Sequence, residues 1–336
     1  MNQIGAVNQH MKIKVIYKGL SEDQAYQVVW KDHVFDYSPQ CQDYDWILVY
    51  DEFPKNSVGS VQNQEEVLNC PPEQTILVTT EPPTIKLYPS FYTHQFGYVL
   101  TTHEQSELPH PNYRLGQGCL LWFYSKTMDE LRSYPEMPKS KILSTVCSSK
   151  QQGHTLHGKR YQLTKYLADR LPELDWYGHG VRWLDKKDDG LDDYKYHISI
   201  ENYCAPHHWT EKLADPILPL ALNFYAGDPK AHECLPEGSF IPIPLDDPEA
   251  AYQIIRDAID QNAYEKALPA LKEARKLLLE KYNLYAQVVQ VIENHEKTYN
   301  KDHVLKHRSI KGRHRLRKRP LNALKALWGQ IRFRLK

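Results

Sequence analysis

A carboxylate and a carboxamide, Glu201 and Asn202, directly follow the short apolar run of residues 197–200. Such a run is typical of a buried strand, and in open α/β sheets ligands bind beyond the carboxyl ends of the strands. After an irregular loop, Thr210 can cap a helix whose first turn contains Lys212. Free N–H groups and the dipole at a helix start favour phosphate, and the lysine adds a full positive charge. This segment is therefore suited to a phosphorylated ligand.

Glu211, beside Lys212, is a hydrogen-bond acceptor for hydroxyls of a ribose or a sugar. The alternative is that Glu211 and Lys212 are only the solvated first turn of a helix. For an isolated Thr-Glu-Lys sequence, that alternative is favoured. Residues 223–225 are apolar enough for a further strand, and the turn Gly227-Asp228-Pro229 follows.

The whole of residues 194–243 resembles the α-1,3/4-fucosyltransferase family, glycosyltransferase family 10. The matching motifs are Tyr194-Lys195-Tyr196, Glu201-Asn202, Thr210-Glu211-Lys212, Gly227-Asp228-Pro229 and residues 235–241. His208 stands where the family has a tyrosine, and it can still donate a hydrogen bond. The resemblance implies inverting transfer of fucose from GDP-fucose to a glycan hydroxyl. The expected linkage is α-1,3 to an N-acetylglucosamine or glucose unit of lipopolysaccharide or another surface glycan.

The resemblance extends upstream of this segment. Residues 142–149 resemble the family's preceding strand, and Arg160 stands at the family's arginine in an amphipathic helix. The resemblance implies that Arg160 and Lys212 hold the diphosphate, while Asn202 and Glu211 contact the nucleotide. A planar guanidinium suits phosphate because it can bond two oxygens at once. Without the family match, a surface arginine is the favoured interpretation of Arg160. Glu201, His208 and Thr210 complete the predicted donor site.

Glu81 is the candidate catalytic base. It follows the apolar run of residues 76–78 and precedes Pro82-Pro83, where family members have Glu-Ser-Pro. An inverting transfer needs a base to take the proton of the acceptor hydroxyl. A partly buried Glu facing no cation has a raised pKa, closer to that task. The alternatives are a Glu that merely ends a strand, or a shifted alignment with Glu104 or Glu107 as base.

Metal chemistry is not expected. The six cysteines are scattered without a C-x-x-C pair, which argues against zinc and fits a reducing cytosol. His154, His157, His207 and His208 match no helical metal motif. No D-x-D pair stands at a strand end. The resemblance likewise implies a metal-independent enzyme without a cofactor, whose donor substrate is GDP-fucose.

The length of 336 residues predicts about two domains. Strands are expected at residues 12–17, 46–50, 75–79 and 96–100 of an acceptor-side α/β domain, residues 1–140. A donor-binding α/β domain spans residues 141–248, and helices span residues 249–300. The strand pattern alone indicates only an α/β fold. The resemblance implies GT-B, with two Rossmann-like domains, a cleft between them and a C-terminal helical extension.

Residues 301–336 form a basic tail with 13 Lys and Arg against one Asp, although the chain totals 42 of each sign. Within the tail, one predicted helical face carries apolar residues: Leu321, Leu324, Leu327, Trp328, Ile331 and Leu335. A basic amphipathic helix with Trp indicates binding to an anionic membrane surface. The alternatives are a disordered tail, docking onto the acidic body, and nucleic-acid binding, which charge alone does not separate from lipid binding. The apolar face favours a membrane, so no nucleic-acid partner is expected.

No signal-peptide core and no run of 18 apolar residues occur, so a cytoplasmic protein, peripheral on the inner face of the cytoplasmic membrane, is expected. The main alternative function is transfer from another nucleotide sugar. The second is a non-catalytic relative that binds glycan or membrane.

Overall fold

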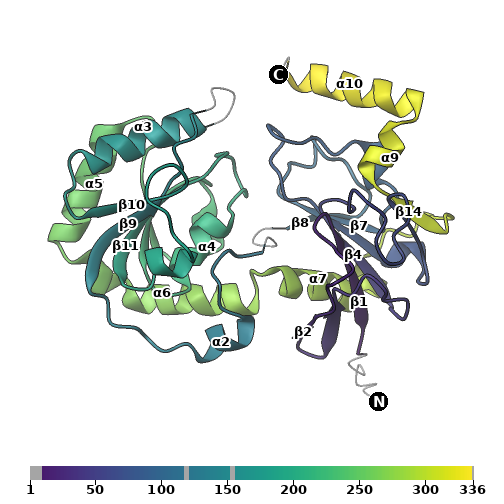
Figure 1. Ribbon diagram of the computed structural model, residues 1–336, viewed down its shortest axis with the longest axis horizontal. Helices are drawn as coiled ribbons and strands as arrows, with labels where there is room; N and C mark the ends of the chain where they lie inside the picture. Colours follow the sequence, from purple (N-terminus) through teal and green to yellow (C-terminus); the bar gives the residue numbers. More distant parts are fainter. Residues whose placement is uncertain (1–9, 117–120, 152–155, 335–336) are drawn as a thin grey trace. The chain divides into compact units, whose positions relative to one another are not determined.

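The computed structural model describes residues 10–116, 121–151 and 156–334 (Figure 1). The chain forms two compact units, residues 1–119 together with 285–336, and residues 120–284. Each unit is built on its own mainly parallel sheet, which confirms the predicted α/β class.

The sheet of the first unit has seven strands, and all but one neighbouring pair run parallel. In spatial order they are β2 (Gln27–Trp30), β3 (His33–Asp36), β1 (Lys12–Tyr17), β4 (Trp46–Tyr50), β6 (Thr75–Val78), β7 (Tyr98–Thr101) and β8 (Tyr113–Leu115). The four strands predicted in this part of the chain are present. These strands could be predicted from the sequence because parallel strands are buried on both faces and so form continuous apolar runs. The short helices η1 (Pro72–Gln74) and α1 (Ser90–Thr93) connect β5 (Glu65–Val67) to β6 and β6 to β7.

The C-terminal part of the chain returns to this first unit. It forms α7 (Leu284–Glu293), α8 (His295–Thr298), β14 (Ser309–Lys311), α9 (Arg313–Arg317) and α10 (Pro320–Arg334). β14 pairs antiparallel with β5 (Glu65–Val67), and Ile310 and Leu316 are buried in the core of the unit. The segment predicted as a separate tail from residue 301 is thus docked as far as α9.

The second unit has a five-stranded parallel sheet in the order β10 (Leu174–Tyr177), β9 (Lys141–Val146), β11 (Tyr194–Ile200), β12 (Leu222–Ala226) and β13 (Phe240–Pro242). Its helices are α2 (Met128–Ser133), α3 (His157–Ala168), α4 (Glu211–Ile217), α5 (Pro248–Asp260) and α6 (Ala263–Glu280), with short turns η2 (Lys187–Gly190) and η3 (Ala231–Glu233). Helix α3 lies beside α5, and α4 lies beside α6 (Figure 1).

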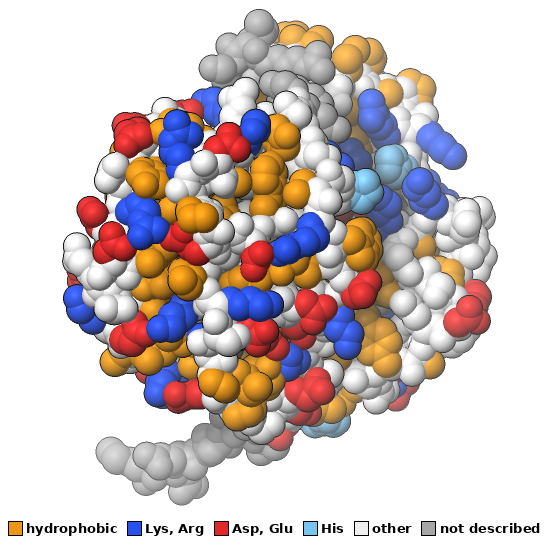
Figure 2. Space-filling view, turned by 60° about the vertical axis from the view of Figure 1, so that its left-hand side comes forward, with side chains coloured by type: hydrophobic (Ala, Val, Ile, Leu, Met, Phe, Trp, Pro, Cys, Tyr) orange, Lys and Arg blue, Asp and Glu red, His pale blue; other side chains and the backbone are white. Residues whose placement is uncertain are grey.

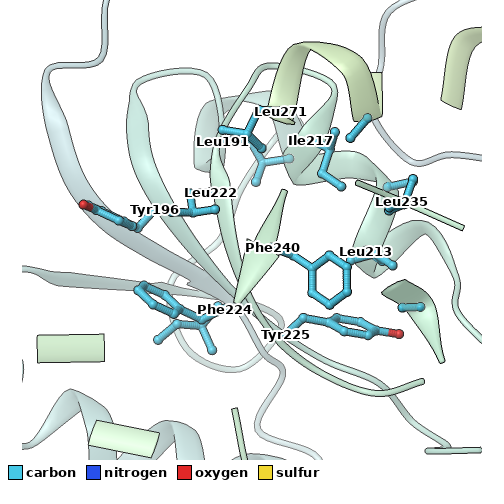
Figure 3. Packing of buried hydrophobic residues seen from close by; sticks show 14 of the residues in the cluster. Leu191, Tyr196, Leu213, Ile217, Leu222, Phe224, Tyr225, Leu235, Phe240 and Leu271 are labelled. Carbon is cyan, nitrogen blue, oxygen red and sulfur yellow. The ribbon is translucent and has the colours of Figure 1, made fainter. Parts of the chain in front are cut away.

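Aromatic and branched side chains fill the core of the second unit. Tyr196 and Phe224, on neighbouring strands, stack with ring centroids 5.5 Å apart, and Leu213 of α4 belongs to the same cluster (Figure 3). Ile255 of α5 and Leu271 of α6 are fully buried in this cluster. Of the helices predicted as a separate region at residues 249–300, α5 and α6 therefore belong to this unit, whereas α7 and α8 belong mainly to the first. The second unit also starts before the predicted boundary at residue 141.

Basic, acidic and apolar side chains are interspersed on the face in front in Figure 2 and do not separate into large patches of one sign. Across the described part of the chain, no helix combines the length and the apolar character that a membrane span requires.

Candidate donor site

The carboxyl end of β11 and the start of α4 build the site predicted in the second unit. β11 ends at Ile200, and the N–H of Glu201 still donates to the carbonyl of Ala226 at 2.8 Å. Thr210 caps α4 as predicted, its hydroxyl accepting from the N–H of Lys212 at 3.3 Å. The sequence pattern therefore located both elements correctly.

Glu201 is the hub of this region. Its side chain is 1% exposed, and it accepts from the N–H of Thr210 at 2.9 Å and from the Thr210 hydroxyl at 2.8 Å. The hydroxyl of Tyr225 on β12 donates to the same carboxylate at 3.2 Å. Burial raises the pKa of Glu201, against the lowering influence of Lys212. Glu201 therefore ties the start of α4 to the sheet, and its oxygens are occupied by protein donors.

Lys212 is held between two carboxylates. Its ammonium lies 2.9 Å from Glu211 Oε1 and 3.6 Å from Glu201 Oε2, and its side chain is 20% exposed. Although burial opposes the charge, the two carboxylates raise the pKa of Lys212, and Lys212 in turn lowers the pKa of Glu211 against burial. The two carboxylates thus outweigh burial and keep Lys212 charged at neutral pH.

Arg160 of α3 reaches the same strand end. Its guanidinium donates to Oδ1 of Asn202, and the residue is buried, at 7% exposure. Its charge acts on Lys212, whose pKa it lowers slightly, so the two cations share one electrostatic environment. The Nε of Arg160 is buried without a hydrogen-bond partner within the described residues. A buried donor without a partner is costly, so this atom is a candidate contact for an anionic ligand.

His208 and Gly227 shape the surroundings of the hub. His208 is buried, and its ring packs edge-on against Tyr203 with centroids 5.3 Å apart. A Cβ at Gly227 would lie 2.2 Å from the hydroxyl of Tyr225 and 2.6 Å from Cγ of Glu201. The glycine of the predicted turn is therefore required because the hub side chains fill that space.

Sequence reasoning missed two members of the network. Lys187 in η2 pairs with Asp215 of α4 at 2.6 Å, and its charge also lowers the pKa of Glu211. Asp215 is fully buried, and burial raises its pKa to about 6. The spacing of Asp215 one helical turn after Glu211 could have indicated from the sequence that the two lie on the same face of α4. Lys187 lies in a polar loop, and nothing in the sequence around it indicated a role in the site. Tyr225 was recognised only as part of a strand.

Glu81 lies in the first unit, three residues after the end of β6, and its side chain is exposed. This differs from the partial burial that would raise the pKa of a base. Its main chain is well fixed: its N–H donates to the hydroxyl of Tyr88 at 3.2 Å, and Nε2 of His103 lies 2.8 Å from its carbonyl oxygen. Burial lowers the pKa of His103, so the neutral ring donates to that carbonyl. The alternatives Glu104 and Glu107 lie in a turn after β7.

No group of three His, Cys, Asp or Glu side chains that could hold a metal ion occurs among residues 10–116, 121–151 and 156–334. His157 begins α3, His207 and His208 lie in the loop before α4, and His154 falls outside the described residues.

Solved structures show the fold class to which these units belong. A crystal structure of an α1,3-fucosyltransferase with GDP-fucose matches with a TM-score of 0.50 at 13% identity, over 89% of this chain and 96% of that chain. An α1,3-fucosyltransferase crystal structure with GDP gives a TM-score of 0.43 at 14% identity, over 85% and 95%. Sucrose-phosphate synthase from Thermosynechococcus elongatus gives 0.41 at 9% identity, over 86% and 88%.

No protein-family model matches the chain, and no curated protein matches it. The likeness to the GDP-fucose complex concerns the fold. It confirms that the chain has the GT-B class of fold, with two α/β units on separate, mainly parallel sheets.

Proposed function

We propose that the chain is an inverting glycosyltransferase that moves fucose from GDP-fucose to a hydroxyl of a glycan acceptor. The product would be an α-1,3 linkage to an N-acetylglucosamine or glucose unit of lipopolysaccharide or another surface glycan. One observation carries the donor half of this proposal. Arg160, whose buried Nε has no hydrogen-bond partner among residues 10–116, 121–151 and 156–334, and the charged Lys212 interact electrostatically at the carboxyl edge of a parallel sheet. The sequence resemblance supplies the choice of fucose.

Arg160 and Lys212 would stabilise the leaving GDP, whose negative charge grows in the transition state. Their neighbours Asn202 and Glu211, which these cations already contact, would bind the nucleotide. Glu201 and Thr210 would act by keeping Lys212 in place, since their polar atoms are engaged with each other. With two fixed cations at the diphosphate, we propose that the transfer needs no metal ion.

Binding of GDP to the full-length protein, measured by titration calorimetry in the presence of EDTA, tests the donor site. Lys212→Ala should weaken GDP binding at least tenfold, since a charge-assisted contact contributes about 1.5–3 kcal/mol. Lys230→Ala, which removes a half-exposed lysine of the same unit, is the matched control. Equal GDP affinity of the two variants would contradict the proposed role of Lys212. Tighter binding of UDP than of GDP would favour another nucleotide sugar as donor.

Glu81 would take the proton of the acceptor hydroxyl. Glu81 is exposed at the surface of the first unit, and its main chain is fixed by Tyr88 and His103. Glu81→Gln should lower kcat by at least a hundredfold with little change in GDP affinity, because a general base contributes typically 10²–10⁴-fold. Glu104→Gln and Glu107→Gln are the controls, and either of them would be the base if it alone abolished turnover.

We further propose that α10 rests on an anionic membrane surface at the inner face of the cytoplasmic membrane. Leu321, Leu324, Leu327, Trp328 and Ile331 are between 41% and 73% exposed along this helix. Exposed Lys318 and Arg319 precede it. An apolar face beside basic residues is the pattern of an interfacial helix.

Co-sedimentation with vesicles of mixed anionic and neutral lipid tests the membrane proposal. The double variant Leu324→Gln/Trp328→Gln should lose most of the binding, whereas Trp183→Gln, which changes a 70% exposed tryptophan of the other unit, should keep it. A truncation before β14 is unsuitable because Ile310 and Leu316 belong to the core. Unchanged binding of the double variant would refute the role of α10.

A further inference from the structure

A groove of about 320 Å³ lies in the first unit between α10 and the loops near α1 and after β7. Leu87 and Phe91 line one wall, and Ala326, Trp328 and Gly329 of α10 line the other. The small residues Ala326 and Gly329 leave open space that larger side chains on this helix face would fill. The groove is therefore built by α10 and the body of the unit together.

The groove adjoins the main chain of Glu81. Tyr88 and His103 line it, and these are the two side chains that fix the N–H and the carbonyl of Glu81. A molecule seated in the groove thus lies against the residues that position the proposed base. This contiguity connects the groove with the proposed base.

The apolar part of the lining fits a hydrocarbon chain. Pro89 and Pro109 on the loop side have no N–H to offer a peptide backbone, and no strand edge lines the groove among the described residues. Trp328 both lines the groove and is 68% exposed, beside Leu324 at 62% on the outer face of α10. Apolar surface therefore continues from the proposed membrane face into the groove. Ser106, Glu107 and Lys325 provide polar lining for the head of an amphiphile.

We propose that this groove binds the alkyl or prenyl chain of an amphiphilic acceptor and so presents the acceptor's sugar to Glu81. The inference rests on the proposed function for the identity of the sugar-bearing ligand. Chain binding itself does not depend on turnover. Under this proposal, the acceptor is a lipid-linked glycan, and α10 also forms one wall of the acceptor site.

Binding of n-alkyl β-glucopyranosides tests the groove directly. The probes carry a bromine at the chain end and are used below their micelle concentration. The readout is quenching of tryptophan fluorescence in the full-length protein, with Trp328 as the reporter. Each added methylene should tighten binding about fourfold, which corresponds to about 0.8 kcal/mol, until the groove is full.

Ala326→Phe fills the groove from α10 and should weaken binding of the longer glucosides at least tenfold. Ala323→Phe makes the same change at an exposed position of the same helix that does not line the groove, and it should bind like the unaltered protein. Leu324→Gln should also leave chain binding unchanged. Equal affinity of the two Phe variants, or loss of binding in Leu324→Gln, would overturn the proposal.

A kinetic arm separates this inference from the proposed function. With a matched pair of glycan acceptors carrying a methyl or an octyl aglycone, the octyl acceptor should have the lower KM in Ala323→Phe but not in Ala326→Phe. Turnover with the same KM for the methyl and octyl acceptors would contradict chain binding in the groove but would leave the proposed transferase activity supported. Groove-dependent binding of alkyl glucosides without turnover of any acceptor would support the groove and contradict the transferase.

Discussion

Replacing Glu201 tests whether this carboxylate is the structural hub of the donor site. Glu201→Ala removes the acceptor of three donors, which are the N–H and hydroxyl of Thr210 and the hydroxyl of Tyr225. A buried donor left without a partner costs about 1–3 kcal/mol. Lys212 also loses one of its two carboxylates. Because water can enter the space that the side chain leaves, we expect a total loss of about 3–5 kcal/mol of unfolding free energy.

Glu201→Gln separates charge from hydrogen bonding. Burial already raises the pKa of Glu201, so the fold disfavours the charge, and a neutral amide of the same shape keeps an acceptor for Thr210. The expected loss is about 1 kcal/mol, since one neutral hydrogen bond contributes about that much.

Urea unfolding of the full-length protein, followed by a probe for the second unit, measures both changes. Glu237→Ala, an exposed position in the same unit, should stay within about 0.5 kcal/mol of the unaltered protein. The reasoning is refuted if Glu201→Ala is no more destabilising than this control. It also fails if Gln is as harmful as Ala, because charge and not hydrogen bonding would then hold the site together.

Three further predictions concern single residues of both units. Lys14→Met leaves Glu66, its fully buried partner at 2.7 Å, without a counter-charge, so we expect a loss of about 3–5 kcal/mol in urea unfolding. The double variant Lys14→Met/Glu66→Leu should lose clearly less, and an additive loss would contradict this. Burial lowers the pKa of His110 to about 4, so the unfolded chain takes up a proton below about pH 6.5 that the folded chain refuses. Stability contributed by His110, about 3 kcal/mol at most, is therefore present above pH 6.5 and lost as the pH falls toward 4; a His110→Gln variant with the same pH slope as the unaltered protein would contradict this. Arg160→Lys keeps the charge but loses the planar fork, and it should weaken GDP binding about tenfold in calorimetry; unchanged affinity would mean that Arg160 does not contact the diphosphate.

The sequence predicts the strands and the helix start of the site well because their signals are local. The runs at residues 46–50 and 197–200 are continuous apolar segments, as buried parallel strands require. Thr210 precedes its helix with the cap chemistry that the structure shows. The order of motifs around Lys212 then identified which polar residues share one strand end.

What the sequence could not predict depends on contacts between distant segments. Ile310 and Leu316 stand in a strongly basic stretch, and only pairing of β14 with β5, more than 240 residues away, makes them core residues. From the sequence, Glu201 was interpreted as a ligand contact. In the structure, the hydroxyl of Tyr225 donates to its carboxylate, which gives Glu201 a structural role. Neither the exposure of Glu81 nor the contacts of its main chain with Tyr88 and His103 could be predicted from a local pattern.

The measurement that tests the central claim most directly is release of GDP from GDP-fucose, compared with GDP-mannose and a UDP-sugar, with EDTA present and a mixture of bacterial glycans as acceptors. The account predicts acceptor-stimulated release from GDP-fucose alone, unaffected by EDTA and lost in Lys212→Ala. Release from another donor in its place would contradict the assignment of fucose. No release from any donor, together with no thermal stabilisation of the protein by GDP, would contradict the transferase itself.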